Sequence, residues 1–136
     1  MRHCLIEHGT RVEMYAGVIM PTHVHLLFKP LEDDEGEPFA LSAITKGIKG
    51  SSAYNINKVL SRKGTLWLPE SFDRILRRGD FERRLNYILA NPVVAGLASR
   101  RDEYRWGWRQ MADLTALHLE EPGQLLVGGQ VWRVRA

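Results

Sequence analysis

The sequence predicts an α+β fold, and three observations predict it. Val12 to Met20 and residues 22–28 are rich in strand-forming side chains and are separated by one proline, which predicts an antiparallel hairpin. Residues 38–60 and 80–90 repeat apolar side chains near every 3.6 positions, the period of an amphipathic helix. Between them, Phe72 to Leu76 can form a third strand. The chain is therefore expected to combine helices with a sheet whose first two strands are antiparallel neighbours.

Length and composition indicate one globular domain. The chain has 136 residues, of which 44% are hydrophobic, enough for a core of ordinary size. Cys4 is its only cysteine, so no intramolecular disulfide can form and a reducing compartment fits. The sequence shows neither a secretory signal pattern nor an apolar run of membrane-spanning length. We therefore expect a cytoplasmic protein without a membrane partner.

Charge is modest overall but unevenly distributed. The formal net charge of +3 permits a nucleic-acid partner without requiring one. Residues 38–69 contain no Asp or Glu, and the acidic residues gather just before them, in 32–37. The basic residues of the acid-free stretch are Lys46, Lys49, Lys58, Arg62 and Lys63. Lys46 and Lys49 flank the apolar stripe of the 38–60 helix and can form either a solvated face or a phosphate-contacting surface. The lack of acidic residues in this stretch favours the phosphate-contacting surface.

The chain is organised around two histidines on the second strand. His23 and His25 are separated by one residue, and strand side chains alternate between faces, so both imidazoles point the same way. Two imidazoles at this spacing can converge on one divalent metal ion, or they can simply occupy the solvated face of a half-buried sheet. Val24 and Leu26 face the opposite side and can anchor the strand in the core.

A second group of polar residues lies on the 80–90 helix. Its core face is formed by Phe81, Leu85, Ile88 and Leu89. At about 100° per residue, Tyr87 falls well off this stripe, as do Arg83 and Arg84, so the tyrosine can present its hydroxyl to a ligand from a basic face. Asn91 follows Tyr87 by four residues and shares its side if the helix continues. Because Asn91 precedes Pro92, it can instead cap a new turn.

Further arginines and aromatics flank this helix. Arg74 and Arg77 precede it and can bind phosphate through two parallel hydrogen bonds, or can be ordinary surface charges. Residues 100–109 interleave Tyr104, Trp106 and Trp108 with arginine, a pattern that suits base stacking but is more typical of a tail packed on its domain. Residues 124–134 have β character and predict an edge strand or hairpin.

Two motifs together resemble a known family. Met20-Pro21-Thr22-His23-Val24-His25-Leu26-Leu27 is followed by Tyr87-Ile88-Leu89-Ala90-Asn91-Pro92-Val93-Val94-Ala95-Gly96-Leu97. In this order and spacing they resemble the single-tyrosine HUH transposases, and in particular the REP-associated tyrosine transposases of bacteria. Supporting residues between and after the motifs are Lys49-Gly50, Asn57, Gly64, Trp67, Phe72-Asp73-Arg74, Tyr104 and Trp106. The resemblance covers roughly residues 10–110.

The resemblance implies a fold and a chemistry. The fold would be a ferredoxin-like α+β sandwich with the histidine strand central in an antiparallel sheet and the helices on one face. His23, His25 and Asn91 would bind Mg²⁺ or Mn²⁺, and Tyr87 would be the nucleophile. The partner would be hairpin-forming single-stranded DNA, cut through a 5′-phosphotyrosine intermediate by a monomer or homodimer. Its DNA contacts are expected from Lys46, Lys49, Arg74, Arg77, Arg83 and Arg84.

The sequence also departs from the family. The resemblance begins almost at the hairpin, without the first strand and helix that members usually carry, which implies an N-terminally shortened domain over residues 1–110 and a C-terminal extension over 111–136 that packs on it. Thr22 stands where asparagine is usual. Two other functions therefore compete: a truncated or domesticated module that binds hairpin DNA without cutting, and a nucleotidyl hydrolase with alternating histidines. Leu27, at the position of a third histidine, argues against the hydrolase.

Overall fold

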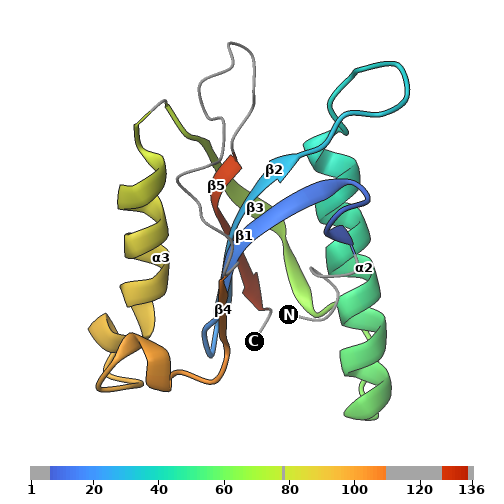
Figure 1. The fold of residues 1–136 in the computed structure, drawn as a ribbon. Coiled ribbons are helices and arrows are strands. Elements are labelled where there is room, and N and C mark those ends of the chain that lie inside the picture. Colours follow the sequence, from blue (N-terminus) through green and yellow to red (C-terminus); the bar gives the residue numbers. More distant parts are fainter. Residues whose placement is uncertain (1–6, 78, 110–126, 135–136) are drawn as a thin grey trace.

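The computed structural model describes residues 7–77, 79–109 and 127–134 (Figure 1). The described elements, in chain order, are β1 (Val12–Ile19), β2 (His23–Pro30), α2 (Leu41–Val59), β3 (Trp67–Ile75), α3 (Phe81–Val94), the short 3₁₀ helix η1 (Arg101–Glu103), β4 (Gly107–Arg109) and β5 (Val127–Val134). None of the described helices combines the length and the apolar character needed to cross a membrane.

One antiparallel sheet forms the centre of the fold. Its strand order is β3-β5-β2-β1-β4, and every neighbouring pair is antiparallel, so the histidine strand β2 takes the middle position. The predicted α+β class and the β1–β2 hairpin are confirmed. The edge strand or hairpin predicted for 124–134 is wrong, because β5 lies inside the sheet and pairs with both β2 and β3. Strand propensity predicts that this segment is extended but not which edge it joins.

The two long helices cover opposite faces of the sheet, so the expected placement of both helices on one face is wrong (Figure 1). Helix α2 packs Ile44 and Ile48 in one apolar cluster with Val24, Leu26 and Phe28 of β2. Helix α3 forms the other cluster, whose members from the strands are Tyr15, Ala16, Val18 and Leu27. Both faces of β1 and β2 carry apolar side chains, and each face needs a cover to exclude water.

Hydrogen bonds tie α2 to β3 and to the connection that precedes it. The Lys49 ammonium donates to the Ser71 hydroxyl at 2.7 Å and to the Leu68 carbonyl at 3.2 Å. The Trp67 indole donates to Ser52 at 3.0 Å, and Asn57 donates to the Gly64 carbonyl at 2.8 Å. Several residues that support the family resemblance therefore have a structural task, which is to position β3.

Helix α3 continues past the Asn91–Pro92 pair as far as Val94, so of the two alternatives for Asn91 the continuing helix is the one observed. Pro92 lacks an N–H and is usually unfavourable inside a helix. Here its ring is buried on the core side of α3, and the helix resumes at once with a 2.9 Å hydrogen bond from Ala95 N–H to the Asn91 carbonyl. Burial of an apolar ring thus offsets the missing hydrogen bond, and Asn91 keeps its place one turn beyond Tyr87.

Because separate apolar clusters hold the two helices, conservative truncations in each should act independently. Ile48→Val in α2 and Ile88→Val in α3 each remove one methylene from a fully buried side chain and should lower the free energy of unfolding by about 0.5–1.5 kcal/mol. The double variant should show the sum within about 0.5 kcal/mol. Urea unfolding measures this, with Val59→Ala, at an 81% exposed position, as the control. Strong coupling between the two substitutions would contradict the two-cluster core.

Candidate metal and nucleophile site

The two histidines of β2 meet at the face covered by α3. Strand alternation puts His23 and His25 on the same face as Leu27, which belongs to the α3 cluster. The two Nε2 atoms lie 3.0 Å apart, with the rings nearly perpendicular at 85°. Thr22 Oγ1 lies 3.0 Å from His23 Nδ1 and so orients the half-buried ring from its other side. The two rings thus share a hydrogen bond that holds one nitrogen of each within reach of a single ion.

Burial keeps His25 neutral. Only 4% of this residue is exposed, and the pKa of its imidazole is lowered to about 4, chiefly because burial disfavours the charged form and secondly because of the charges of His23 and Arg84. Its Nδ1 is buried and has no hydrogen-bond partner among the described residues. A neutral imidazole can bind a metal ion.

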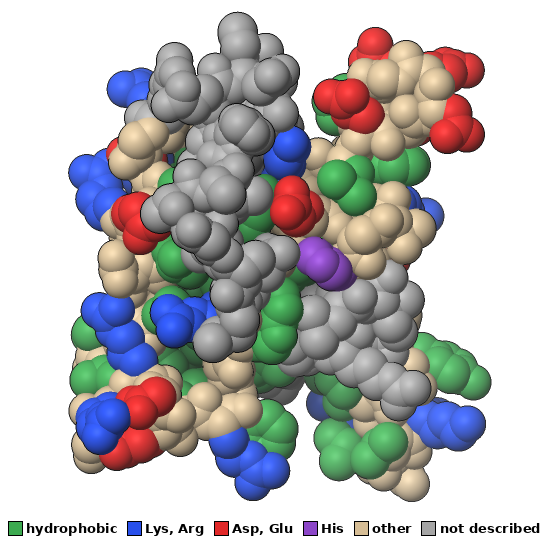
Figure 2. All heavy atoms as spheres, viewed as in Figure 1, with side chains coloured by type: hydrophobic (Ala, Val, Ile, Leu, Met, Phe, Trp, Pro, Cys, Tyr) green, Lys and Arg blue, Asp and Glu red, His purple; other side chains and the backbone are tan. Residues whose placement is uncertain are grey.

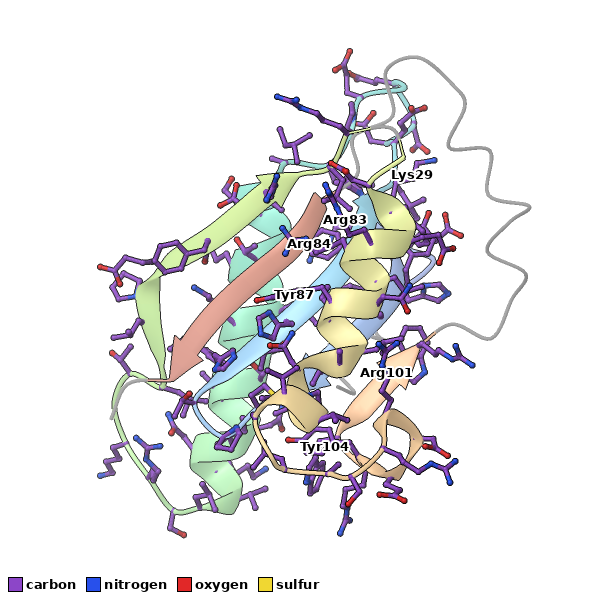
Figure 3. All side chains as sticks on the ribbon, turned by 90° about the vertical axis from the view of Figure 1, so that its left-hand side faces the viewer. Lys29, Arg83, Arg84, Tyr87, Arg101 and Tyr104 are labelled. Atoms are coloured by element: carbon purple, nitrogen blue, oxygen red, sulfur yellow. The ribbon has the colours of Figure 1, made fainter. Side chains whose placement is uncertain are left out.

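Tyr87 is held beside this pair by α3. The residue is 53% exposed, and its ring lies 6.1 Å from the ring of His25, centroid to centroid, at an interplanar angle of 86°. The Arg84 guanidinium lies 5.2 Å from the centre of the tyrosine ring, in a cation–π arrangement. Figure 3 shows that Arg84 and Tyr87 extend from the same side of α3. The Tyr87 ring therefore lies beside both the His25 ring and the Arg84 guanidinium.

The other three tyrosines have different surroundings. Tyr15 is 1% exposed and donates a hydrogen bond to Glu13, and burial raises the pKa of its phenol. Tyr104 donates to the Ile19 carbonyl at 2.7 Å, as expected of an aromatic packed on the domain. Tyr54 is 68% exposed on α2, on the far side of the sheet from the histidines. Of the four tyrosines in the chain, Tyr87 alone has an accessible ring next to the histidine pair.

Asn91 lies one turn beyond Tyr87 on the same side of α3. Its Nδ2 donates to the Tyr87 carbonyl at 2.8 Å, which fixes the amide and leaves Oδ1 as the atom able to accept or to ligate. Among the described residues, no group of three or more His, Cys, Asp or Glu side chains gathers at a possible metal site. A metal bound by His23 and His25 therefore needs a neutral oxygen ligand from the protein, or phosphate and water.

The histidine pair fits a small hexacoordinate ion. In an octahedral site with bonds of about 2.1 Å, neighbouring ligand atoms lie about 3.0 Å apart, and this matches the separation of the two Nε2 atoms. Imidazole nitrogens suit Mn²⁺, and oxygen ligands suit Mg²⁺ or Mn²⁺. The structure brings His23 and His25 together for such an ion, and the Asn91 amide oxygen stays the predicted third ligand.

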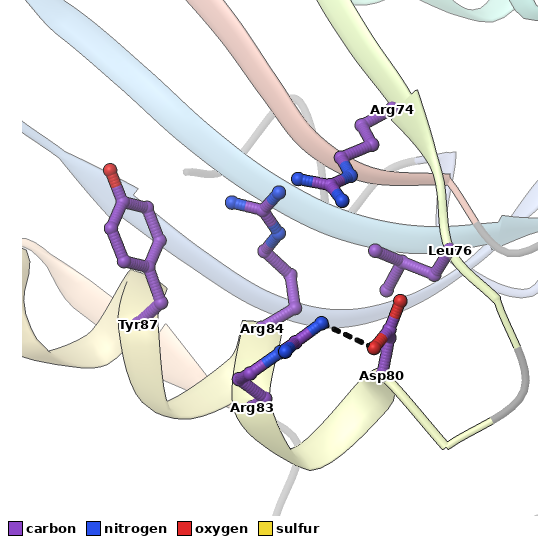
Figure 4. A pocket seen from close by; sticks show the side chains of 6 residues that line it. All are labelled: Arg74, Leu76, Asp80, Arg83, Arg84 and Tyr87. Atoms are coloured by element: carbon purple, nitrogen blue, oxygen red, sulfur yellow. Dashed lines mark hydrogen bonds and ion pairs between the residues drawn. The ribbon is translucent and has the colours of Figure 1, made fainter.

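The predicted DNA-contacting residues fall into two groups. Arg74, Arg83 and Arg84 line one pocket of about 360 Å³ together with Tyr87, Asp80 and Leu76 (Figure 4). Arg77 is exposed in the connection between β3 and α3 and does not line this pocket. Lys46 and Lys49 belong to α2, on the opposite face of the sheet, and the ammonium of Lys49 is engaged with β3. The structure therefore places only the arginine group beside Tyr87.

The acidic loop that follows β2 lies at the opposite end of this strand from His23. The exposed side chains of Glu32, Asp33, Asp34, Glu35 and Glu37 form a loop after β2, whereas His23 begins β2 at its other end. Figure 2 shows these acids gathered at the top right, and several Lys and Arg side chains along the α3 side at the left. Separation along the length of β2 lowers repulsion between the acidic loop and an anion bound beside Tyr87.

Comparisons with protein-family models, with curated proteins and with solved structures found no match for this chain. Two contacts in the site were missed by sequence reasoning. Thr22 orients His23, a contact that its position next to the histidine motif could have suggested. Arg84 stacks over Tyr87, and their spacing of three residues on a helix is the signal that could have found it.

The low pKa of His25 predicts how stability depends on pH. An unfolded histidine has a pKa near 6.5, so between about pH 6.5 and pH 4 the unfolded chain binds a proton that folded His25 does not. As the pH is lowered through this window, the free energy of unfolding should therefore fall by up to about 1.4 kcal/mol per pH unit. The His25→Gln variant should lack this contribution. NMR titration of the imidazole protons checks the cause, and a midpoint near 6.5 for His25 would contradict it.

Proposed function

We propose that the chain is a metal-dependent, single-stranded DNA endonuclease and strand transferase of the HUH single-tyrosine type, a transposase acting on DNA hairpins. The observation that carries the proposal is the position of Tyr87, whose accessible ring lies 6.1 Å from His25 of the histidine pair. A nucleophile beside a site able to polarise phosphate oxygens is the arrangement that phosphoryl transfer needs. The family resemblance of the two motifs agrees with this arrangement.

The proposed reaction exchanges one phosphate ester for another. The Tyr87 phenol loses its proton to solvent, and its oxygen forms a bond to the scissile phosphorus. The bond from phosphorus to the 3′-oxygen breaks, and this oxygen takes a proton to become a free 3′-OH. The product is a 5′-phosphotyrosine link, and a 3′-OH can reverse the step to join a strand. Ester number is conserved, so the exchange requires no high-energy cofactor.

The protein residues orient the phosphate and the phenol. A bound Mg²⁺ or Mn²⁺ would supply Lewis-acid polarisation of a phosphate oxygen. His23 and His25 present neutral nitrogens, Asn91 presents an amide oxygen, and Arg84 holds the tyrosine ring through its cation–π contact.

Single-stranded DNA is the substrate that this surface favours. Arginines beside Tyr87 provide charge for the phosphates, and Trp106, 51% exposed with Arg105 stacked on it at 4.4 Å, offers a face for a base. The Trp106 carbonyl accepts a hydrogen bond from Ile19 N–H near the end of β1 that leads to the histidines. Cytoplasmic location and a monomeric or homodimeric state belong to the same proposal.

Tyr87→Phe should abolish the covalent protein–DNA adduct and leave DNA binding intact. Losing one exposed hydroxyl should change the free energy of unfolding by less than about 1 kcal/mol. The assay incubates the chain with single-stranded hairpin DNA and Mn²⁺ and detects the adduct by its shift on a denaturing gel. Tyr54→Phe, the same chemical change on the far face, is the matched control and should form adduct normally. An adduct in Tyr87→Phe would move the chemistry to another residue.

Replacing the histidines should remove metal binding together with cutting. His23→Ala and His25→Gln should each lower Mn²⁺ affinity by at least about tenfold, since one ligand is lost, and DNA cleavage should disappear. Titration of Mn²⁺ followed by electron paramagnetic resonance measures binding separately from activity. His8→Gln, which changes a histidine outside the pair, should leave both properties unchanged. If the intact chain binds Mn²⁺ and hairpin DNA but never cuts the DNA, the result would contradict the endonuclease and support the alternative of a module that binds hairpin DNA without cutting it.

A further inference from the structure

Arg74 and Arg84 converge on one pocket from different elements. Arg74 lies on β3 and Arg84 on α3, and Figure 4 shows the two guanidinium groups directed toward one another across the pocket opening. Tyr87 lines the other end of the same pocket. Arg84 is half-buried, and Arg74 is exposed to solvent. Two arginines brought together by tertiary folding, rather than by neighbouring positions in the chain, make a candidate site for a shared ligand.

The pocket carries positive charge that its own acid does not neutralise. Asp80 is the single carboxylate among the lining residues, and Arg83 already binds it at 2.5 Å. Within the described part of the chain, neither Arg74 nor Arg84 has a carboxylate partner. Like charges facing one another repel, so the arrangement is most stable with an anion between them. Phosphate suits this place because guanidinium groups bind it through paired, charge-assisted hydrogen bonds.

We propose that Arg74 and Arg84 clamp one phosphodiester of the bound strand, namely the phosphate adjacent to the one that Tyr87 attacks. The identity of the ligand as single-stranded DNA rests on the proposed function, whereas the clamp itself rests on the pocket. The clamped phosphate differs from the reacting one because Arg84 precedes Tyr87 by three residues, about 4.5 Å along the helix axis, while Asn91 lies on the opposite side of Tyr87. The clamp therefore holds the strand in register so that the next phosphate meets Tyr87.

The first experiment tests the clamp without DNA. Inorganic phosphate is titrated into ¹⁵N-labelled protein at constant ionic strength, and the Nε–Hε signals of the arginines are followed by NMR. The signals of Arg74 and Arg84 should move on one binding curve, while that of Arg100, paired with Asp102, should not move. Arg84→Gln should weaken the response of Arg74 at least about tenfold, as the loss of a charge-assisted hydrogen bond predicts. Independent curves for Arg74 and Arg84, or no response, would overturn the clamp.

The second experiment uses single-stranded DNA and the uncutting Tyr87→Phe chain. Affinity for an oligonucleotide is measured from low to high salt, where each neutralised phosphate contributes about 0.7 to the slope of log affinity against log salt. Arg74→Gln and Arg84→Gln should each weaken binding, and the double variant should lose about 0.7 of slope in total, since both residues serve one phosphate. Arg100→Gln, with the same loss of charge, is the matched control and should keep the full slope.

The two experiments separate the clamp from the proposed function. A phosphate response without any binding of single-stranded DNA would refute the proposed function and leave the anion site standing. Binding of DNA with a slope that both substitutions leave unchanged would refute the clamp and leave the proposed function standing. If the double variant lost about 1.4 from the slope of log affinity against log salt, the two arginines would contact separate phosphates, which also refutes the clamp.

Discussion

The alternation of side chains along β2 is the constraint on which the site depends. Val24, Leu26 and Phe28 pack against α2, so the intervening His23, His25 and Leu27 must face α3. A slip of one residue would turn the histidines into the core beneath α2 and move the apolar side chains to the other face. Pairing with β1 and β5 on both sides resists such a slip. The same apolar residues that stabilise the fold therefore aim the imidazoles.

Helix α3 provides the complementary constraint. At about 100° per residue, its buried residues Phe81, Leu85, Ile88 and Pro92 fall within an arc of about 60°. Arg84, Tyr87 and Asn91 fall within a second arc of about 60°, beside the first. Because the core arc is pressed against the sheet, the second arc is held at its margin, where side chains reach both the histidines and solvent. Packing of Leu85 and Ile88 thus sets the position of Tyr87 without direct contact to a substrate.

Local patterns predicted the parts of the site that depend on period alone. The hairpin, the shared face of His23 and His25, and the position of Tyr87 off the core stripe follow from periods of two and 3.6. Features that depend on tertiary pairing were not predictable in this way. These include the insertion of β5 beside β2, the use of Lys49 to hold β3, and the meeting of Arg74 with Arg84. The sequence around Asn91 is ambiguous because the local rule for a residue before proline competes with burial of the Pro92 ring.

The sequence does carry an indication that helices cover both faces of the sheet. Strands β1 and β2 are apolar at consecutive positions such as Met14-Tyr15-Ala16 and Leu26-Leu27-Phe28, whereas a sheet covered on one face alternates apolar with polar residues. The consequence reaches the site. With α2 on one face and α3 on the other, β3 is bound to α2 by Lys49 and Trp67, yet it carries Arg74 toward α3. The far layer of the fold thereby positions a charge beside Tyr87, which explains how residues remote from the histidines can bear on the same surface.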